Sequence, residues 1–374
     1  MKLTDICDFQ GGSQPPKEEW SLEVQEGYIR MLQIRDFTQS EKVQPEYIKI
    51  SNTTKMCEAD DILIARYGAS IGKILTGLAG AYNVAIMRTI PDTNRIQKKY
   101  LFYYLKSPYF QNAIMNVGVR AAQAGFNKED LSKLEIECPS MSEQSNIIKR
   151  LTKIDIVINK RKKEMRLLDD LIRARFVEMF GDMYLNSKGW PEAKLESMAD
   201  VVSGITKGRK TKAEDLTEVP YMAVSNVKDG YIDWTTVKTI EATQQEIEQY
   251  RLLADDVLMT EGGDPDKVGR GAIIKEPLEN CIHQNHIFRV RLDESMILPE
   301  FFAEYLQHQR SKRYFLGCAK QTTGIASINM TQLRALPVLI PPLSKQEEFV
   351  LFKAQVDKSK LLENSYPNIL PLSA

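Results

Sequence analysis

The chain has 374 residues, more than the roughly 100–150 residues of a typical single domain, so we expect at least two globular units. Hydrophobic residues make up 43% of it and charged residues 27%, which excludes a membrane-embedded or wholly disordered protein. The sequence contains no uncharged apolar run of about 18 residues, and its start lacks the pattern of a secretory signal. Five widely separated cysteines are typical of free thiols, so we expect a cytoplasmic protein.

The net charge is zero, which argues against a protein that coats nucleic acid by bulk charge. The charge is nevertheless unevenly distributed. Residues 142–180 hold 10 basic and 6 acidic side chains, whereas residues 1–141 hold 17 of each and residues 181–374 hold 23 and 27. The excess positive charge therefore lies in one segment, and a local patch for nucleic acid stays possible.

The two halves of the chain resemble each other in collinear order, which indicates an internal duplication. The difference in residue number between matching segments grows from 192 to 202 along the chain, as expected when the loops of the two halves differ in length and their helices and strands do not. The clearest pairs are Lys2–Gly12 with Lys194–Gly204, Tyr28–Phe37 with Tyr221–Gly230, Asp60–Gly68 with Asp255–Gly263, and Asn127–Gln144 with Asn329–Gln346.

Short strand-like runs dominate each half. Ile62–Ala65 and Val257–Met259 follow paired aspartates that we interpret as turn residues, and Ile287–Leu292 alternates apolar and polar side chains. One longer helix is predicted in each half, over Tyr100–Met115 and Phe301–Leu316. We therefore predict an α/β (α+β) fold with two such domains in tandem.

A long helix is predicted after each domain, and the two should form an antiparallel coiled coil. Residues 142–180 contain no Gly or Pro, Ser140 and Glu143 form a capping box before them, and Gly181 ends the segment. Apolar residues recur along this helix every seven positions. The predicted seam consists of Ile147, Leu151, Ile154, Ile158, Met165, Leu168, Ile172 and Met179 on the first helix, and of Phe349, Phe352 and Val356 on the second.

These elements divide the chain into five predicted segments. The first domain covers residues 1–141, the first helix residues 142–180 and the second domain residues 181–342. A shorter second helix covers residues 343–366, because Pro367 ends it, and residues 367–374 form a tail.

Motifs for catalysis are missing. GASIGK (Gly68–Lys73) has three residues between its glycines instead of the four of a phosphate-binding loop, so we interpret it as a glycine-rich turn. His283 and His286 lie near Cys281 but point to alternate faces of an expected strand, and we expect no metal there. HExxH, GxSxG and Asn-Pro-Pro-Tyr motifs are absent, so we predict that the chain is not itself an enzyme.

Two divergent α/β domains, each followed by a helix that opens with Pro-x-x-x-x-Gln, resemble the specificity (S) subunit of type I DNA restriction-modification enzymes. The resemblance rests on Pro139–Leu151, Arg166–Asp182 and Ile340–Phe349, together with DDILIARYG and DDVLMTEGG, and covers about residues 1–366. It implies two target-recognition domains, each reading one half of a bipartite site in double-stranded DNA, in a non-catalytic subunit.

The resemblance also implies partners. The helices are similar to the spacer that docks two methyltransferase (M) subunits, and restriction (R) subunits join through that complex. The chain itself would hold no cofactor, whereas S-adenosylmethionine and ATP would bind to the partner subunits. The shorter second helix departs from the family, whose two helices are usually similar in length, and leaves open whether full docking occurs.

Side chains that could read DNA are expected in loops beside the glycine turns, because Arg, Asn and Gln present paired groups to base edges and Lys contacts phosphate. No positional motif of the family transfers here, since target-recognition domains diverge with the sequences that they read. The candidates are Arg35, Arg66, Tyr67, Lys73, Arg120, Gln123 and Asn127 in the first domain, and Asn226, Lys228, Lys267, Arg270, Lys320, Gln321 and Asn329 in the second.

Two other functions stay open from the sequence alone. A duplicated protein-binding scaffold would use its helices as dimerisation arms and would have no DNA specificity. A methyltransferase or nuclease in a single chain is the third hypothesis, and the missing catalytic motifs argue against it.

Overall fold

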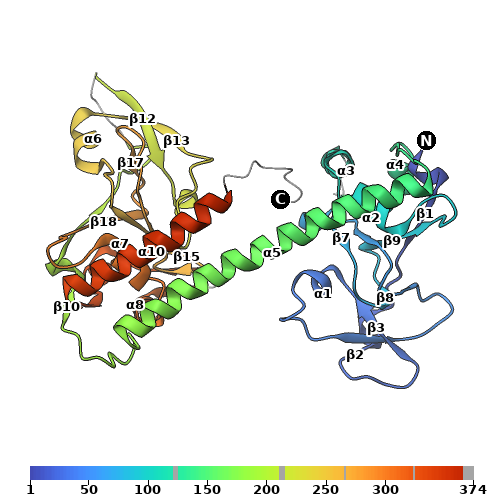
Figure 1. Cartoon of the computed structure of the whole chain (residues 1–374), viewed down its shortest axis with the longest axis horizontal. Coiled ribbons are helices and arrows are strands. Elements are labelled where there is room, and N and C mark those ends of the chain that lie inside the picture. Colours follow the sequence, from blue (N-terminus) through green and yellow to red (C-terminus); the bar gives the residue numbers. More distant parts are fainter. Residues whose placement is uncertain (121–124, 210–214, 265–266, 323–324, 365–374) are drawn as a thin grey trace. The chain divides into compact units, whose positions relative to one another are not determined.

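The structure is a computed structural model that describes the chain except residues 121–124, 210–214, 265–266, 323–324 and 365–374 (Figure 1). Its contacts cluster into two compact units. Unit 1 begins at Met1 and unit 2 begins at Glu164, directly after Lys163. The boundary between the units therefore falls inside the long helix α5 (Met141–Phe180).

Unit 1 contains two sheets. One has four strands in the order β1-β9-β6-β7, and the other has five in the order β2-β4-β3-β8-β5. Neighbouring strands pair antiparallel except β3 and β8, which pair parallel. The strands are β1 (Cys7–Gly11), β2 (Trp20–Ser21), β3 (Tyr28–Leu32), β4 (Glu46–Lys49), β5 (Met56–Cys57), β6 (Leu63–Ala65), β7 (Ile74–Leu75), β8 (Gly80–Tyr82) and β9 (Ile86–Pro91).

The main core of unit 1 lies between the four-stranded sheet and the helices that follow β9. Ile64 and Met87 from the sheet belong to one buried cluster with Leu101 and Phe110 from the helices. Apolar side chains of two elements are thereby removed from water together, which is the dominant stabilising contribution. The helices of this unit are α1 (Ile34–Thr38), α2 (Lys98–Leu105), α3 (Pro108–Arg120), α4 (Lys128–Leu131) and the first part of α5.

The prediction of a single helix over Tyr100–Met115 is wrong, because α2 and α3 are separate helices with a break before Pro108. Proline has no N–H for the helical ladder and disfavours helical dihedrals at the preceding residue. The prediction of one helix over Phe301–Leu316 is also wrong, because α7 (Pro299–Tyr305) and α8 (Gln309–Cys318) are separate helices, here without a proline at the break. In unit 2 the Ser311 hydroxyl donates to the carbonyl of Tyr305 at 3.0 Å, at the break between two helices.

Unit 2 repeats the two main sheets and adds two small ones. Its sheets have the orders β11-β18-β14-β16, β13-β12-β17, β15-β20-β19 and β10-β21. The strands are β10 (Glu192–Lys194), β11 (Ala199–Ser203), β12 (Thr217–Met222), β13 (Lys238–Ala242), β14 (Val257–Thr260), β15 (Gly262–Gly263), β16 (Gly271–Ile273), β17 (Ile282–His283), β18 (Ile287–Leu292), β19 (Lys320–Thr322), β20 (Ile325–Ser327) and β21 (Pro337–Leu339). The helices are α6 (Gln244–Tyr250), α7 (Pro299–Tyr305), α8 (Gln309–Cys318), α9 (Met330–Arg334) and α10 (Leu343–Asn364).

The predicted duplication is confirmed by the strand orders. The order β1-β9-β6-β7 of unit 1 corresponds strand by strand to β11-β18-β14-β16 of unit 2. The parallel pair β3 and β8 likewise corresponds to the parallel pair β12 and β17. The α/β (α+β) fold with two tandem domains is therefore confirmed.

Helix α5 agrees closely with its predicted bounds, and α10 begins at the predicted residue, Leu343. The predicted end of the second helix at residue 366 and the predicted tail 367–374 lie outside the described residues. The Ser140 backbone N–H donates to the Glu143 carboxylate at 2.9 Å and the Glu143 backbone N–H donates to the Ser140 hydroxyl at 3.3 Å, which are the two reciprocal bonds of a capping box. Gly181 adopts a left-handed φ of 78°, which ends α5 where a residue with a Cβ would be strained. In unit 2, Arg175 pairs with Glu348 and Asp169 pairs with Lys360, each through contacts of 2.8 Å or less. Because the earlier residue of α5 pairs with the later residue of α10, the two helices run antiparallel there.

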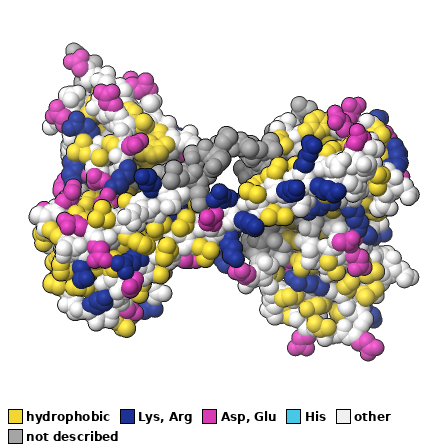
Figure 2. Space-filling view, viewed as in Figure 1, with side chains coloured by type: hydrophobic (Ala, Val, Ile, Leu, Met, Phe, Trp, Pro, Cys, Tyr) yellow, Lys and Arg dark blue, Asp and Glu magenta, His cyan; other side chains and the backbone are white. Residues whose placement is uncertain are grey.

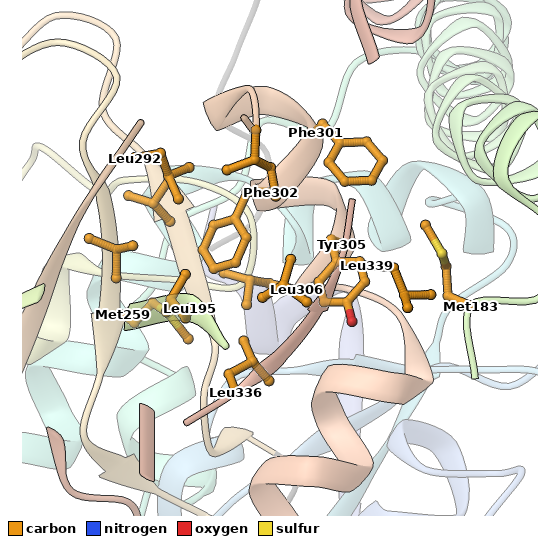
Figure 3. Close-up of a cluster of buried hydrophobic side chains, with 14 of the residues drawn as sticks. Met183, Leu195, Met259, Leu292, Phe301, Phe302, Tyr305, Leu306, Leu336 and Leu339 are labelled. Carbon is orange, nitrogen blue, oxygen red and sulfur yellow. The ribbon is translucent and has the colours of Figure 1, made fainter. Parts of the chain in front are cut away.

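The largest buried cluster lies in unit 2 (Figure 3). Phe301, Phe302 and Tyr305 of α7 pack with Leu195 and Leu339 in this cluster. The end of α5 and the start of α10 contribute to it as well, so the helix pair and the second domain share one core. Of the helices in the described residues, none is long and apolar enough to cross a membrane.

Candidate functional site

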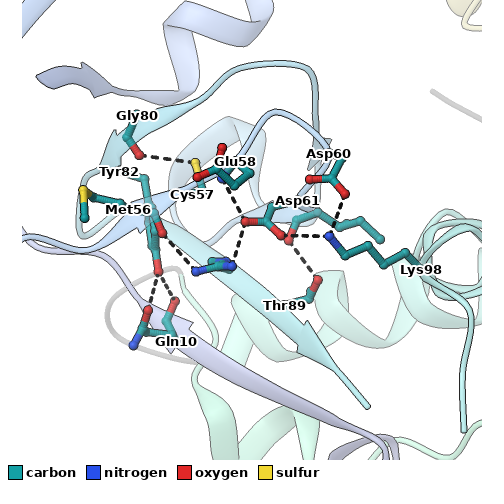
Figure 4. A network of polar contacts seen from close by, with 12 residues as sticks. Gln10, Met56, Cys57, Glu58, Asp60, Asp61, Gly80, Tyr82, Thr89 and Lys98 are labelled. Atoms are coloured by element: carbon teal, nitrogen blue, oxygen red, sulfur yellow. Dashed lines mark hydrogen bonds and ion pairs between the residues drawn. The ribbon is translucent and has the colours of Figure 1, made fainter. Parts of the chain in front are cut away.

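The second aspartate of each Asp-Asp pair is buried and forms an ion pair with an arginine of the four-stranded sheet in the same unit. In unit 1 an Arg88 guanidinium nitrogen lies 2.8 Å from the Asp61 carboxylate, which is 4% exposed (Figure 4). The Asp61 carboxylate also accepts the backbone N–H of Glu58 at 2.9 Å and lies 3.3 Å from the Lys98 ammonium. In unit 2 Arg291 contacts the buried carboxylate of Asp256 in the same way, at 2.8 Å. These aspartates therefore stabilise the turn that leads into a strand.

Arg66 and Tyr67 lie close together at the end of β6. The Arg66 guanidinium donates to the carbonyl of Phe126 at 3.3 Å, and its central carbon lies 5.0 Å from the centre of the Tyr67 ring. Tyr67 is 38% exposed. A Cβ on Gly125 would meet the Tyr67 ring at 2.3 Å, so glycine is required for this close approach. Arg66 and Tyr67 thus lie beside a glycine, and whether they contact DNA stays a prediction.

The other candidates of unit 1 are more dispersed. Arg35 is exposed on α1 and pairs with Glu46. Lys73 is exposed in the turn before β7, and the Asn127 side chain accepts the N–H of Asp130 at 3.1 Å as the cap of α4. Arg120 ends α3, but its side chain is outside the described part of the structure, and Gln123 lies wholly outside the described residues.

One candidate of unit 2 requires a correction. Asn226 is fully buried, and its amide nitrogen donates to the carbonyl of Asp233 at 2.9 Å and to the Thr236 hydroxyl at 3.3 Å. Its amide oxygen accepts the N–H of Ala223 at 2.9 Å. The side chain therefore stabilises its own turn and does not present a pair of groups to a base. Turn-forming asparagines and base-reading asparagines look alike in a sequence.

The remaining candidates of unit 2 are at or near the surface. Lys228 is half-buried, 3.9 Å from Asp233, and Lys267 is exposed and pairs with Asp264. Arg270 is half-buried, and its Nε has no hydrogen-bond partner in the described residues. Lys320 is exposed, and Asn329 caps α9 by accepting the N–H of Gln332 at 2.9 Å. The side chain of Gln321 is outside the described part.

The sequence prediction missed a pair in unit 2, the half-buried Glu261 with the exposed His286. The carboxylate of Glu261 contacts Nδ1 of His286, and the two residues are also joined by a backbone hydrogen bond of 3.0 Å. In the internal repeat, Glu261 corresponds to Arg66, so the same place at the end of the central strand carries opposite charges in the two units. The alignment of DDILIARYG with DDVLMTEGG is the signal that could have found it.

His283 is part of the core of unit 2. Its ring nitrogens lie 3.1 Å from the carbonyl oxygen of Tyr250 and 3.4 Å from that of Val202. Burial lowers the pKa of His283 to about 4, although the two carbonyls oppose that shift. Within the described residues no group of three or more His, Cys, Asp or Glu side chains is arranged to hold a metal ion.

Lys and Arg side chains lie along the exposed face of α5 (Figure 2). Lys149, Arg150, Lys153 and Lys160 are all exposed in the part of the helix that belongs to unit 1. The predicted excess of positive charge is therefore at the surface, where it raises the local potential for an anionic partner.

Where α5 and α10 share one unit, the residues of the predicted seam pack into one apolar cluster. Leu168, Ile172, Met179, Phe349, Phe352 and Val356 all belong to the same apolar cluster or pack against it. Met165, and in unit 1 Ile147, Leu151, Ile154 and Ile158, are half-buried. The prediction missed Phe176, whose fully buried ring lies 5.2 Å from that of Phe349. It continues the series of Ile172 at the helical spacing of four rather than seven.

Comparisons with known proteins place both domains in one family. The family described as "Type I restriction modification DNA specificity domain" matches residues 1–166 and 187–370. The chain is 27% identical over 169 residues to the putative type I restriction enzyme MjaX specificity subunit of Methanocaldococcus jannaschii, covering 45% of this chain and only 39% of that protein. It is 22% identical over 391 residues to the MjaVIII specificity subunit of the same organism, covering 97% of this chain and 85% of that protein.

A solved structure supports the same assignment at the level of the fold. The S subunit of a type I restriction-modification system from M. genitalium superposes with a TM-score of 0.50 and 15% identity, covering 97% of this chain and 90% of that chain. At this identity the likeness shows a common fold. Since the family match extends over both domains and most of the sequence, the chain belongs to the type I restriction-modification DNA specificity domain family.

Proposed function

We propose that the chain is the DNA-sequence specificity subunit of a type I restriction-modification complex, and that each globular domain reads one half of a bipartite site. The observation that carries this proposal is that the family match occurs twice, once over each of two domains with the same strand order. A duplicated reader suits a target with two halves, because each copy can diverge toward its own sequence.

In unit 1 the proposed reading surface centres on Arg66 and Tyr67. A guanidinium can donate two parallel hydrogen bonds to the O6 and N7 atoms of guanine. The exposed edge of Tyr67 lies beside it and can contact a sugar, a phosphate or a base. In unit 2 the equivalent place carries Glu261 and His286, and a carboxylate there would accept a hydrogen bond from N4 of cytosine. The two domains would then differ in sequence preference at the same structural position.

In this proposal the chain carries no chemistry of its own, and partner subunits supply it. M subunits would bind S-adenosylmethionine and methylate the DNA, and R subunits with ATP would join through the complex. The basic exposed residues of α5 in unit 1, and the pair that α5 forms with α10 in unit 2, are the surfaces that we expect M subunits to use. The relatives named above, which are specificity subunits of type I restriction enzymes, support this division of labour.

Genome-wide mapping of methylated adenines in cells with and without this gene tests the proposal. We expect one bipartite motif to lose methylation when the gene is deleted and to regain it when the gene is restored. A methylation pattern that is identical in both strains, while the methyltransferase gene of the same system is expressed, would contradict it.

A further inference from the structure

The small sheet β15-β20-β19 of unit 2 places three residues in one row across its strands. Gly262 of β15 lies opposite Ser327 of β20, and Ser327 lies opposite Lys320 of β19. Directly opposite residues of neighbouring strands have their side chains on the same face of a sheet. Lys320 is exposed and Ser327 is half-buried, so this face of the row is open to solvent. The row begins directly after Glu261, whose carboxylate contacts His286.

The internal repeat gives this row a counterpart in unit 1, where an aromatic ring covers it. Tyr67 corresponds to Gly262, and Gly125 corresponds to Ser327. Tyr67 and Gly125 also lie opposite each other, in an isolated β-bridge. The Tyr67 ring lies against Gly125, where a Cβ would meet it at 2.3 Å. In unit 2 the glycine has moved to the first strand, so the position of the ring carries no side chain of its own.

The glycine at position 262 leaves the backbone of the row accessible. The three described atoms nearest to a Cβ on Gly262 all belong to the neighbouring strand β20, and the closest is the carbonyl oxygen of Ala326 at 3.0 Å. Unit 1 accommodates the side chain of Tyr67 at the equivalent place, so the fold itself does not demand a glycine there. A glycine within a strand is typical of a place where a ligand or another backbone approaches closely.

Two polar side chains of the row have no partner in the described part of the chain. There the Lys320 ammonium forms no ion pair and the Ser327 hydroxyl forms no hydrogen bond. Adjacent strands lie about 4.8 Å apart, so an ammonium and a hydroxyl on opposite residues can donate to one anion. Ile325 lies two residues before Ser327, hence on the same face, and is 57% exposed. The face therefore combines donors for an anion with an apolar contact.

One nucleotide of DNA matches this combination. Lysine and serine side chains commonly contact DNA phosphates, and a deoxyribose is largely apolar. Strands β19 and β15 lie two strand spacings apart, roughly 9–10 Å, which is comparable to the distance from the phosphate of a nucleotide to the edge of its base. A phosphate at Lys320 and Ser327 would therefore place the base edge near Glu261, with the sugar over Gly262.

We propose that Gly262, Ser327 and Lys320 seat one sugar–phosphate unit of the target DNA. Lys320 and Ser327 donate to its phosphate, and Gly262 admits the sugar against the protein backbone. The inference rests on the proposed function and assigns three positioning residues to the half-site of unit 2. Unit 1 presents the Tyr67 ring at the equivalent place, so the two domains contact DNA through different chemistry at a shared position of the fold.

The first test uses the complex of the full chain with its methyltransferase subunits and a duplex that carries the methylated motif. Single phosphates of the motif are replaced one at a time by uncharged methylphosphonates. One replacement should weaken binding of the unaltered complex at least threefold. Lys320→Gln should weaken binding to the normal duplex by a similar factor, and that methylphosphonate should then weaken it no further, because the contact is already lost. Lys238→Gln, which changes another exposed lysine of unit 2, is the matched control and should retain the full sensitivity.

The second test covers the row with a ring. Gly262→Tyr combined with Ser327→Gly reproduces the arrangement of Tyr67 on Gly125, which the fold accommodates in unit 1. Binding of the complex to the motif should weaken at least tenfold, whereas Ser327→Gly alone, the matched control, should weaken it at most threefold. Thermal unfolding shows whether the double variant is folded, and Lys320→Gln tests the proposal even if it is not, because Lys320 is exposed.

The same sensitivity to every methylphosphonate in the unaltered complex and in Lys320→Gln would overturn the proposal. Undiminished binding of a folded double variant would overturn it as well. Either result would leave the proposed function intact, provided that the complex still prefers the motif to a duplex of scrambled sequence. A complex of the unaltered chain that does not distinguish these two duplexes would instead count against the proposed function.

Discussion

The side-chain oxygen of Gln144 accepts a hydrogen bond from the backbone N–H of Gln97 at 2.9 Å. Its amide nitrogen donates to the carbonyls of Arg95 and Pro139, at 2.9 and 2.8 Å. The side chain is fully buried, so these three hydrogen bonds satisfy polar atoms that water does not reach. Gln144 therefore joins the first turn of α5 to the residues that lead into α2.

Gln346 makes the same connection in unit 2. Its side-chain oxygen accepts the N–H of Leu298 at 2.8 Å, and its nitrogen donates to the carbonyls of Met296 and Pro341 at 3.1 and 2.8 Å. The Pro-x-x-x-x-Gln pattern thus has a physical cause. The proline ends the preceding segment and offers its carbonyl, and the glutamine closes the contact five residues later.

Replacing Gln144 by alanine should leave buried backbone groups without partners and lower the free energy of unfolding by about 1–3 kcal/mol. Urea denaturation of the full chain measures this loss, and Gln346→Ala should cause a similar one. Gln355→Ala, which removes an exposed glutamine from α10, is the control and should change the stability by less than about 0.5 kcal/mol. Equal stability of Gln144→Ala and the control would show that the buried amide contributes nothing.

Replacing Phe176 by alanine should destabilise unit 2 more strongly. The Phe176 ring is fully buried and stacks on Phe301 and on His308, with ring centres 5.4 and 4.2 Å apart. Truncating such a ring leaves a cavity and typically costs about 3–5 kcal/mol. Val177→Ala changes the next residue, which is 48% exposed, and should cost less than about 1 kcal/mol. The free energy of unfolding of both variants is measured by thermal denaturation. Equal losses for Phe176→Ala and Val177→Ala would contradict the packing of the end of α5 into the core of unit 2.

The features that the sequence predicted correctly depend on local or repeated signals. The capping box at Ser140 and the left-handed Gly181 are set by a few neighbouring residues, and both ends of α5 follow from them. The duplication was visible because the same strand order was encoded twice. Such signals can be recognised in the sequence without any knowledge of tertiary contacts.

The features that the sequence did not reveal depend on contacts between distant segments. Asn226 is chemically suited to read a base, but only the fold shows that three partners within its own turn use its amide. Phe176 was missed because its role depends on Phe301 and Phe349, more than 100 residues away.

The stability of unit 2 should fall with acid as Glu246 becomes protonated. The hydrogen bonds from the Arg209 guanidinium, at 2.5 Å, lower the pKa of Glu246 from 4.5 to about 2, against the opposing effect of partial burial. Because this pKa is lower in the folded state, the contribution is fully present above about pH 4.5 and is lost as the pH falls toward 2.

Glu246→Gln should remove this contribution and lower the free energy of unfolding at pH 7 by roughly 1.5–3 kcal/mol, the usual value of a hydrogen bond to a charged group. The variant should also lose part of the dependence on pH between 4.5 and 2. Glu248→Gln on the same helix is the control, since its carboxylate is exposed. Denaturation curves at pH 7, 4 and 3 provide the measurement, and parallel curves for the two variants would contradict the role of the Arg209 pair.

Exchange of one domain should change one half of the DNA site. Each unit has its own sheets and its own buried cluster, so residues 1–138 can be replaced by the equivalent domain of another family member without altering the core of unit 2. Methylated sites mapped for this chimera should keep the half read by residues 193–341 and acquire a new partner half. The reciprocal exchange of residues 193–341 serves as the control and should preserve the opposite half. A chimera that retains methylation but changes both halves together would mean that neither domain reads its sequence independently, and the assignment of one half-site to each domain would have to be abandoned.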